Sequence, residues 1–374
     1  EELTADRLVF SNGGKSLNIL NLSTATDAGT VSVITTLKKL KPVAKKKIKN
    51  RVNSIIVDNS KLAGSGIGTT TLNNGLTHGN FPFGTRVEDK IISLNSADVL
   101  EVYGVFESSD VSSTPSAPTM DLQSLNSSST TTAELLIGEQ LIGQNTGAIA
   151  IVAEKNDSDT IAFIYSNEIE FAEGETVIFQ ESNVQGVVSV LDASSFDITQ
   201  NYTFNNGQED TFYNYGFVTR RENFDAPSKK IKIYFENGFY DSTDNGDLTT
   251  VNSYDTFDYS TEIQDVNGIR NSDIIDIRPR VADYAVTEGA RSPLEFNGRV
   301  FTQAGQTATN ILASDEDIIV DYSYYLGRID RVFLTKNGSF QVIYGTPSEK
   351  PEPAPPIDEA IEVATIALPP YLYN

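Results

Sequence analysis

The sequence predicts a multidomain, all-β protein with little helix. First, Thr, Ser, Val, Ile, Tyr, Asn, Asp and Gly dominate a composition that favours strands and turns. Second, short alternating runs of apolar residues are separated by glycine-rich turns along the chain. Third, 374 residues exceed what one hydrophobic core ordinarily organises. We therefore expect a β-sandwich-like frame interrupted by one small, internally duplicated β-barrel.

Residues 1–111 are expected to form an N-terminal β region. Within it, residues 31–35, 54–57, 91–94 and 99–106 have strand patterns, and the last alternates well enough to line a half-buried sheet. Glycine-rich turns separate these strands, for example at residues 63–68. That turn lacks the Lys-Ser/Thr ending and the strand–loop–helix context of a phosphate-binding loop, so we interpret it as a flexible turn.

A linker and an internal repeat follow this region. Residues 112–132 are rich in Ser, Thr and Pro, which is typical of a linker. Leu-Ile-Gly-Glu-Gln-Leu-Ile at residues 136–142 returns 36 residues later as Ala-Glu-Gly-Glu-Thr-Val-Ile. Each copy contains one Gly-Glu turn, Gly138-Glu139 or Gly174-Glu175, and an apolar strand comes after it. Residues 133–195 are therefore predicted to form a small β-barrel with pseudo-twofold symmetry.

The remaining residues predict a sandwich-like domain and a connector. In residues 196–345, the segment Lys-Ile-Lys-Ile-Tyr-Phe at 230–235 has the clearest strand alternation, and residues 332–344 predict a hairpin that turns at 336–338. Residues 346–374 are proline-rich and predict an extended connector. Within it, residues 357–368 are expected to form one short helix that ends before Pro369 and Pro370.

The ionisable residues argue against several classes of function. The net charge of −23 repels nucleic acid and anionic lipid, and no apolar run approaches the roughly 18 residues of a membrane span. The chain has no Cys and a single His, His78, which leaves no thiolate nucleophile and no evident His-based triad. A glycoside hydrolase needs only two carboxylates, but no pair stands out and no Trp is present to stack on a sugar. We expect no enzymatic activity and no cofactor.

Residues 241–247 resemble a calcium-binding loop in composition. Oxygen ligands are the only kind available in quantity, and the candidates are Asp241, Asp244 and Asp247. The segment lacks the frame of an EF-hand and its closing bidentate Glu, so we favour a solvated turn over a cation site.

The strongest charge feature is a basic segment at residues 38–51, which holds eight of the 28 basic residues. In isolation such a run would indicate nucleic acid or membrane binding. In a chain of charge −23, docking on an acidic neighbour or on the chain's own acidic surface is the favoured interpretation. We therefore treat the segment as an assembly element, formed by Lys38, Lys39, Lys41, Lys45, Lys46, Lys47, Lys49 and Arg51.

Three stretches carry a resemblance to a known family. The first comprises residues 36–51, 64–73 and 102–110, and the second comprises residues 205–215, 251–254 and Asp-Ile-Arg-Pro-Arg-Val at 276–281. The third runs from Asp-Tyr-Ser-Tyr-Tyr-Leu-Gly-Arg-Ile-Asp-Arg at 321–331 through the hairpin to the proline-rich tail. Together they resemble large tail or baseplate proteins of contractile-tailed marine cyanophages, which include an uncharacterised phage structural domain family.

The resemblance implies a structural protein of the virion, without catalytic residues. It also implies that four arginines in the matching stretches fix the sheets that carry them through ion pairs with Asp276, Asp330 or other acids; they are Arg278, Arg280, Arg328 and Arg331.

The working hypothesis is a tail or baseplate component that holds subunits together by interface burial. The expected partners are other virion proteins and copies of this chain around the tail axis, with no nucleic acid and no membrane. The alternative is a tail-fibre segment that binds host-surface glycans through the duplicated barrel, and the third possibility is a polysaccharide depolymerase. The chain begins at Glu1 without an initiator Met, and we interpret it as an excerpt of a longer polypeptide.

Overall fold

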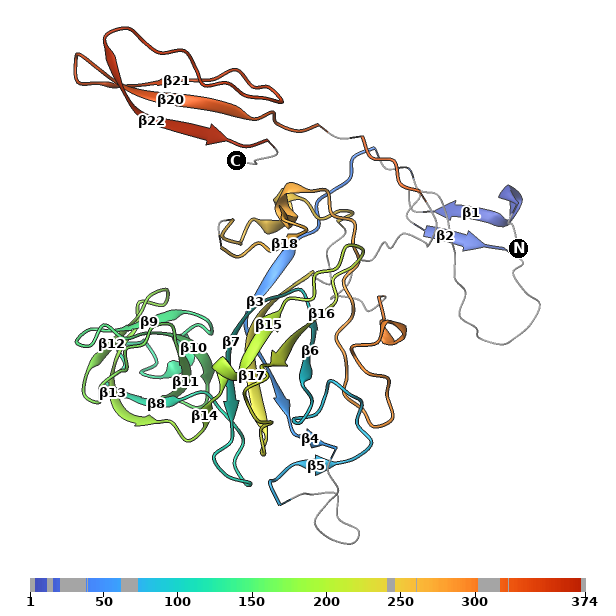
Figure 1. The fold of residues 1–374 in the computed structure, drawn as a ribbon, viewed down its shortest axis with the longest axis vertical. Coiled ribbons are helices and arrows are strands. Elements are labelled where there is room, and N and C mark those ends of the chain that lie inside the picture. The colour runs from blue at the N-terminus through green and yellow to red at the C-terminus, as the bar shows by residue number, and fades with distance from the viewer. Residues whose placement is uncertain are drawn as a thin grey trace. The chain divides into compact units, whose positions relative to one another are not determined.

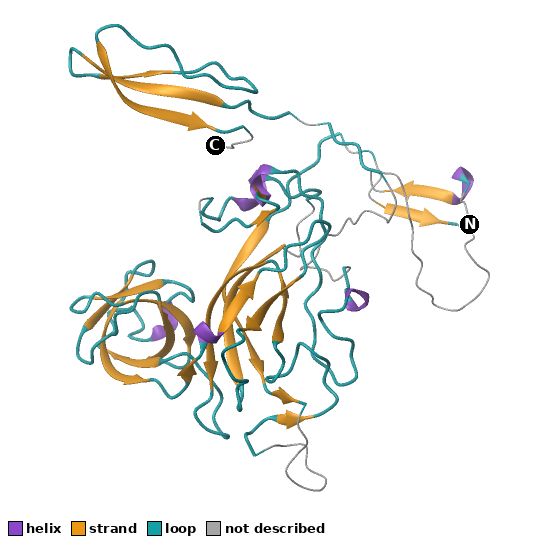
Figure 2. Cartoon of the chain, in the orientation of Figure 1, coloured by secondary structure: helices purple, strands orange, loops and turns teal. Residues whose placement is uncertain are grey.

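The computed structural model describes residues 4–11, 16–20, 38, 40–61, 73–240, 246–259, 261–301, 317–321 and 323–370. The chain divides into two compact units, Glu1–Leu40 and Lys41–Asn374, and each is described by itself. Within the described residues the secondary structure consists of β-strands and short 3-10 helices, which confirms the predicted all-β class (Figures 1 and 2). None of the helices in these ranges has the length and apolarity needed to span a membrane.

The described part of the first unit contains an antiparallel strand pair. The 3-10 helix η1 (Ala5–Arg7) leads into β1 (Leu8–Ser11), which pairs with β2 (Ser16–Ile19). The backbone NH of Leu20 donates to the carbonyl of Arg7 and closes the open end of the pair. The strand predicted at residues 31–35 lies outside the described residues.

The second unit is built on a β-sandwich. One sheet has the order β14-β7-β17-β3, and the other has the order β15-β16-β6. Apolar residues from both sheets form one core, which includes Val57, Ile92, Val105, Val218 and Ile233. The strands are β3 (Lys47–Val57), β6 (Ile91–Ala97), β7 (Val99–Glu107), β14 (Phe196–Asp197), β15 (Tyr202–Asn205), β16 (Tyr215–Arg220) and β17 (Ile231–Tyr240).

The predicted division of this frame into two regions differs from the structure. β17, the strand with the clearest sequence signal, pairs with both β3 and β7, so that Ile233 lies opposite Ile55 on one side and Val105 on the other. Residues 1–111 and 196–345 therefore contribute strands to the same sandwich. The physical reason is that β3 and β7 each leave a row of unpaired backbone groups, which β17 satisfies by lying between them.

The barrel is inserted between β7 and β14 of this sandwich. Its six strands close in the order β10-β11-β8-β13-β12-β9, around a core that includes Met120, Leu141, Val152, Phe163 and Phe179. The closed barrel confirms the predicted insertion. The strands are β8 (Thr119–Gln123), β9 (Gln140–Gly143), β10 (Ile149–Lys155), β11 (Thr160–Tyr165), β12 (Thr176–Phe179) and β13 (Gln185–Asp192).

The predicted linker at residues 112–132 is wrong in part, because β8 lies within it. Met120 and Leu122 are buried in the barrel core and alternate with the more exposed Asp121 and Gln123. Without β8, the strands β11 and β13 would each have an unpaired edge, since β8 pairs with both. The Ser- and Thr-rich surroundings of β8 conceal a short but regular strand pattern.

The C-terminal residues form a sheet of their own, with the order β21-β20-β22. It contains β20 (Arg328–Thr335), β21 (Phe340–Ile343) and β22 (Ala360–Leu368). The helix predicted at 357–368 is wrong, because β22 occupies these residues, is rich in β-branched side chains and pairs along the whole of β20. The proline-rich segment before β22 returns along β20, where the NH of Ala354 donates to the carbonyl of Ile329.

Smaller elements complete the described chain. β4 (Asn59–Ser60) pairs in parallel with β5 (Thr77–His78), which places His78 in a short strand. β18 (Asp265–Val266) pairs with β19 (Ile269–Arg270). The remaining 3-10 helices are η3 (Thr132–Glu134), η4 (Thr199–Asn201), η5 (Val251–Tyr254), η6 (Asn271–Asp273) and η7 (Phe296–Gly298).

Candidate interaction surfaces

The basic segment 38–51 divides into an exposed part and an internal part. Lys38, Lys41 and Lys46 are exposed, and Lys39 lies outside the described residues. Lys45 and Lys47 are buried, and Lys49 and Arg51 are half-buried. We expected this segment to dock either on an acidic neighbour or on the chain's own acidic surface. The C-terminal part of the segment therefore docks on acidic groups of the same chain. The side chain of Lys47 in particular is not accessible to a partner subunit.

Lys47 is the centre of a buried charged cluster. Its Nζ lies 2.7 Å from the Asp98 carboxylate, and both side chains are at most 2% exposed. The rings of Tyr213 and Tyr254 lie 4.5 and 4.8 Å from the same nitrogen. Burial alone would lower the pKa of Lys47, but Asp98, Tyr254 and Tyr240 together outweigh it and raise that pKa. The cluster therefore keeps a charged lysine inside the sandwich, with its partners supplied by the same chain.

Asp247, the described member of the three candidate metal ligands, holds the basic segment instead. Its Oδ2 accepts a hydrogen bond from the NH of Val43 at 3.0 Å, and Lys45 Nζ donates to the carbonyl of Gly246. Asp241 and Asp244 lie outside the described residues. Within those residues, the structure brings together no group of three or more His, Asp or Glu side chains that could hold a metal ion.

The four arginines of the resemblance all form ion pairs, as predicted. Arg278 pairs with Asp276 at 2.8 Å in a buried site, and Arg280 pairs with Asp283 at 3.3 Å. In the C-terminal sheet, Arg328 pairs with Asp330 and Arg331 pairs with Glu362. Arg280 is also buried and donates to the backbone carbonyls of Ala97 and Gly238, which ties the segment around residue 280 to two sandwich strands.

The duplicated Gly-Glu turns have a role beyond turn geometry. Gly138 and Gly174 adopt left-handed φ values of 82° and 85°, as turn chemistry requires. The carboxylate of Glu139 is buried and accepts hydrogen bonds from the NH groups of Leu136, Glu181 and Ser182. The carboxylate of Glu175 makes the equivalent bonds to the NH groups of Ala172, Asn145 and Thr146. The glutamate of each repeat therefore holds a loop of the other repeat. These reciprocal hydrogen bonds follow the predicted pseudo-twofold symmetry.

The barrel is packed firmly against the sandwich. Phe106 and Tyr234 of the sandwich form one apolar cluster with Ala117, Ala162 and Ile164. The Tyr234 hydroxyl accepts a hydrogen bond from the NH of Ala117 at 3.1 Å. Two ion pairs cross the same junction, Lys232 with Glu154 and Arg51 with Glu181. The barrel is therefore held in a defined orientation on the frame, rather than carried on a flexible linker.

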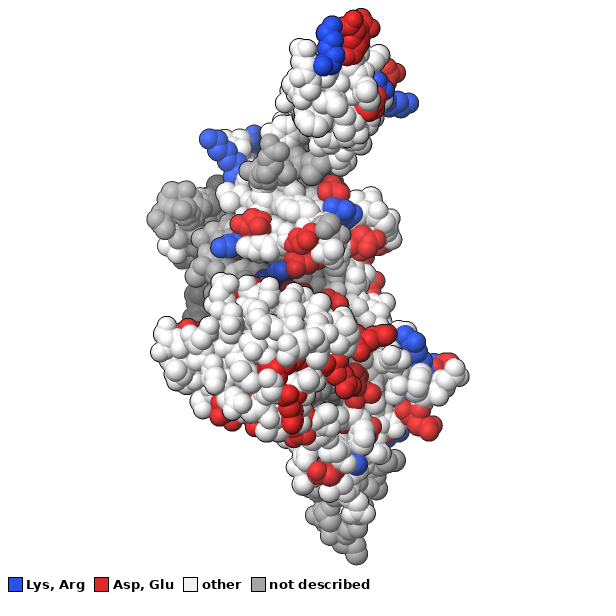
Figure 3. All heavy atoms as spheres, turned by 90° about the vertical axis from the view of Figure 1, so that its left-hand side faces the viewer, with Lys and Arg blue, Asp and Glu red and all other residues white. Residues whose placement is uncertain are grey.

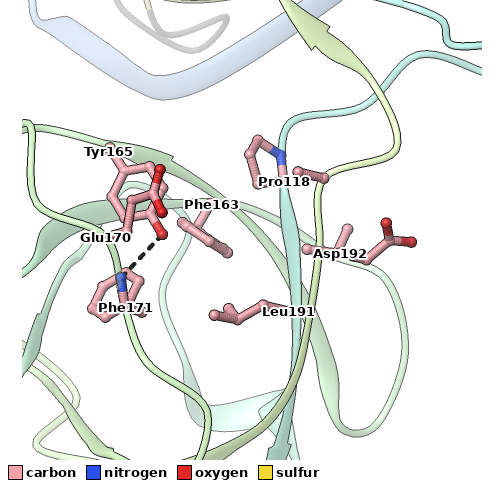
Figure 4. Close-up of a pocket in the computed structure, with 9 residues that line it drawn as sticks. Pro118, Phe163, Tyr165, Glu170, Phe171, Leu191 and Asp192 are labelled. Atoms are coloured by element: carbon pink, nitrogen blue, oxygen red, sulfur yellow. Dashed lines mark hydrogen bonds between the residues drawn. The ribbon is translucent and has the colours of Figure 1, made fainter.

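Beside this junction lies an open groove, which we call the junction groove. A cavity of about 160 Å³ at one end of the barrel adjoins a larger one of about 540 Å³, which reaches β7 and η4 of the sandwich. In the smaller cavity, the rings of Phe163, Tyr165 and Phe171 lie close together, and Tyr165 stacks on Phe171 with ring centroids 5.4 Å apart (Figure 4). The larger cavity adds Phe196, which is 61% exposed.

The charged groups around the junction groove are acidic. Glu170 and Asp197 are exposed and line the larger cavity, and none of its described lining residues is basic. The barrel itself, residues 119–192, contains twelve Asp and Glu residues against one Lys, a net charge of −11. That one residue, Lys155, donates to the carbonyls of Ala133 and Leu135. Acidic side chains gather on the side of the molecule that carries the barrel (Figure 3).

The second candidate surface is one face of the C-terminal sheet, which we call the apolar face. The strand register places Leu334, Phe340 and Ile361 side by side, and Val332 beside Val342. Five large side chains on this face are 42–71% exposed; they are Phe340, Val342, Tyr344, Ile361 and Ile366. Soluble monomers rarely leave such a continuous apolar surface uncovered, so this face is a candidate interaction surface. The opposite face of the same sheet buries Phe333.

Charge on the apolar face is internally balanced. Arg328 and Asp330 lie on this face, and their side chains pair at 3.2 Å. The Arg328 guanidinium also lies over the ring of Tyr344, 5.1 Å from its centroid. The face therefore combines exposed apolar side chains with no net charge.

Sequence reasoning missed the two surfaces for different reasons. The alternation of Phe340, Val342 and Tyr344 was visible, but it predicts a strand without saying whether anything covers it. The junction groove depends on Tyr165 and Phe196, which lie on separate domains and meet only after the barrel docks. No local pattern could have joined them.

Comparison with known proteins gives one match. Residues 280–373, which include the C-terminal sheet, are similar to a family described as a domain of unknown function, DUF4815. Neither the curated proteins nor the solved structures that were compared with the chain give a match.

Proposed function

We propose that this chain is a structural subunit of a bacteriophage tail or baseplate, and that it works by binding copies of itself and neighbouring virion proteins. The single observation that carries the assembly function is the apolar face of the C-terminal sheet, with Phe340 and Ile361 about 70% exposed. The phage setting is supported by the resemblance of the three sequence stretches to cyanophage tail and baseplate proteins. On this proposal the protein resides in the virion and needs no cofactor.

A second copy of this chain is the partner that the apolar face fits best. In a symmetric contact each group of the patch meets the same patch on the other subunit, so an unbalanced charge would face its like. The pairing of Arg328 with Asp330 removes that repulsion at the apolar face, although the chain as a whole carries −23. Two such faces can pack as stacked sheets about 10 Å apart, with their apolar side chains interleaved.

The absence of cysteine from the sequence offers a direct test. Val342→Cys places one thiol on the apolar face, and Gln341→Cys places one on the opposite face of the same strand. With a short bismaleimide, we expect the Val342→Cys chain to form covalent dimers and the Gln341→Cys chain to remain monomeric. Equal cross-linking of both variants, or none of either, contradicts the proposed interface.

The phage setting needs its own experiment. Cross-linking mass spectrometry on purified virions should recover peptides of this chain, joined to a second copy or to other tail proteins. A virion preparation that contains the tail but not this chain would overturn the assignment to the particle, whatever the purified chain does in solution.

A glycan-binding tail-fibre segment is the second candidate function. The observation that favours it is the junction groove, where Tyr165 and Phe196 present aromatic surface beside carboxylates that can accept hydrogen bonds from sugar hydroxyls. The net charge of −11 on the barrel disfavours acidic polysaccharides, so neutral glycans are the relevant class. Saturable binding of a neutral oligosaccharide that Phe196→Ser abolishes would support this candidate.

A further inference from the structure

The junction groove is large enough to hold a ligand. Its larger cavity, about 540 Å³, lies within the range of about 300–1,000 Å³ that is usual for ligand sites. Its lining includes aromatic side chains, among them the buried Phe106 and the exposed Phe196. Because the barrel is fixed to the sandwich through the cluster around Tyr234, the two walls of the groove are held in place before any ligand arrives.

The charge of the groove selects a cationic ligand. Glu170 belongs to the barrel wall and Asp197 to the sandwich wall, and among the described lining residues there is no basic side chain to neutralise them. One oxygen of Asp197 accepts hydrogen bonds from the NH and the hydroxyl of Thr199, which orients that carboxylate. The barrel adds a field of net charge −11. A ligand that brings positive charge and apolar surface together gains from both the carboxylates and the aromatic rings.

The exposed part of the basic segment has this chemistry. Lys38 and Lys41 are exposed, and Leu40 and Val43 between and beside them are 85% and 61% exposed. Pro42 restricts Lys41 to extended conformations, which suits a strand-like ligand. No other run in the sequence brings so many basic residues together. The segment is thus an apolar and cationic strip in a chain that is otherwise strongly acidic.

We propose that the junction groove of one copy binds the Lys38–Val43 segment of a second copy. Lysines 38 and 41 of the incoming segment pair with Glu170 and Asp197, and Leu40 or Val43 packs against Phe196. The proposal rests on the assembly function above but uses a different surface from the apolar face. A chain with one such donor segment and one acceptor groove makes a head-to-tail contact, which closes into a ring when the rotation permits.

A synthetic peptide tests the contact without altering the donor copy. The probe is residues 36–44, Thr-Leu-Lys-Lys-Leu-Lys-Pro-Val-Ala, carrying a fluorophore, and the acceptor is the full chain. We expect saturable binding by fluorescence anisotropy, which weakens as salt screens the charges. Replacing the three lysines of the peptide by Gln should reduce its affinity on the order of tenfold or more, and the acceptor protein remains unchanged in that comparison.

Variants of the acceptor identify the groove. Glu170→Gln combined with Asp197→Asn should weaken peptide binding on the order of tenfold, and Phe196→Ser should weaken it further. Asp225→Asn, at another exposed acidic position, is the matched control and should leave the affinity unchanged. The proposal is overturned if no saturable binding occurs, or if the groove variants and the control behave alike. It is also overturned if maltoheptaose binds the groove and the peptide does not.

The two proposed assembly contacts can be tested independently of each other. Loss of peptide binding in the groove variants leaves the cross-linking through Val342→Cys intact if the apolar face is an interface. Conversely, peptide binding that persists in a chain with Phe340→Ser and Ile361→Ser shows that the groove works even if the apolar face does not assemble.

Discussion

The barrel and the C-terminal sheet are both small antiparallel structures, but the barrel buries its apolar side chains and the sheet exposes many of its own on one face. The barrel closes on itself, so that Met120, Val152 and Phe179 are fully buried. The C-terminal sheet stays open, and its register gathers Phe340, Val342 and Ile361 on a face that remains exposed in the described chain. Closure removes the free edges of a sheet and encloses its inner face as a core, whereas an open three-stranded sheet keeps its edges and encloses neither face by itself.

The difference separates the part of the chain whose groups are matched internally from the part that we propose to bind a partner. The barrel has its polar groups matched internally, down to the buried carboxylates of Glu139 and Glu175. The C-terminal sheet has matched charges but unmatched apolar surface. Substitutions in the barrel should therefore change the stability of the single chain, and substitutions on the apolar face should change association between chains.

The largest effect is expected for Glu139→Ala. The substitution removes the acceptor of three part-buried backbone NH groups in the barrel loops, and donors left without a partner there are costly. We expect the free energy of unfolding to fall by about 3–5 kcal/mol, measured by urea denaturation. Glu168→Ala, at an exposed position of the same barrel, is the control and should change it by less than about 0.5 kcal/mol. Equal effects would mean that the barrel does not depend on its buried carboxylates.

Alkaline pH should lower the free energy of unfolding of the sandwich, because its buried tyrosines ionise less readily in the folded chain than in the unfolded one. Burial raises the pKa of Tyr202 and Tyr215 to about 12, whereas an unfolded Tyr ionises near pH 10. Their stabilising contribution is complete below about pH 10 and is lost as the pH rises towards 12, by about 1.4 kcal/mol per Tyr and pH unit. Of the difference in unfolding free energy between about pH 9 and 11, these two tyrosines should thus contribute roughly 3 kcal/mol, measured by urea denaturation.

Replacing both tyrosines by Phe provides the control for that pH dependence. The slope of unfolding free energy against pH should become shallower in the double variant, because the ionisable groups are gone. A slope identical to that of the unmodified chain would contradict the assignment to Tyr202 and Tyr215.

A smaller effect is expected for Tyr234→Phe at the base of the barrel. The variant keeps the ring that packs on Phe106 but leaves the NH of Ala117 without its acceptor. We expect a loss of about 1–2 kcal/mol in the free energy of unfolding. Limited proteolysis should also cut the segment at residues 112–118 faster, and an unchanged cleavage rate would show that this hydrogen bond does not hold the barrel in place.

The smallest effect should come from Arg51→Ala. Arg51 pairs with Glu181 across the junction, but both side chains are about 40% exposed, so solvent screens the pair. We expect a change of about 0.5 kcal/mol or less in unfolding free energy. A loss of several kcal/mol would mean that ion pairs, rather than the apolar cluster around Phe106, fix the barrel on the sandwich.

Much of the fold could be predicted from sequence because its signals are local. The alternation at residues 230–235 predicted β17, and the repeat of Gly138-Glu139 and Gly174-Glu175 predicted the barrel. The structure confirms both features, and each rests on a short periodic pattern. The arginine ion pairs followed from a resemblance, and the distances of Arg278 and Arg328 to their partners confirm them.

The remaining features required knowledge of distant contacts. β8 forms a strand because it pairs with the free edges of β11 and β13. β22 forms a strand because it pairs with the free edge of β20. Lys47 is internal because Asp98 and three tyrosine rings surround it in the folded sandwich, although its sequence neighbours are basic and mostly polar. The apolar face and the junction groove are likewise products of tertiary packing, which periodicity alone does not specify.

Sedimentation velocity of the full chain tests the central claim most directly. We predict an oligomer at micromolar concentration that dissociates when Phe340 and Ile361 are both changed to Ser, since each loses about 1–2 kcal/mol of apolar burial. Changing Gln341 and Ala367, on the opposite face, to Ser should leave the oligomer intact. A chain that sediments as a monomer, or an oligomer that both pairs of substitutions leave unchanged, would contradict assembly through the apolar face.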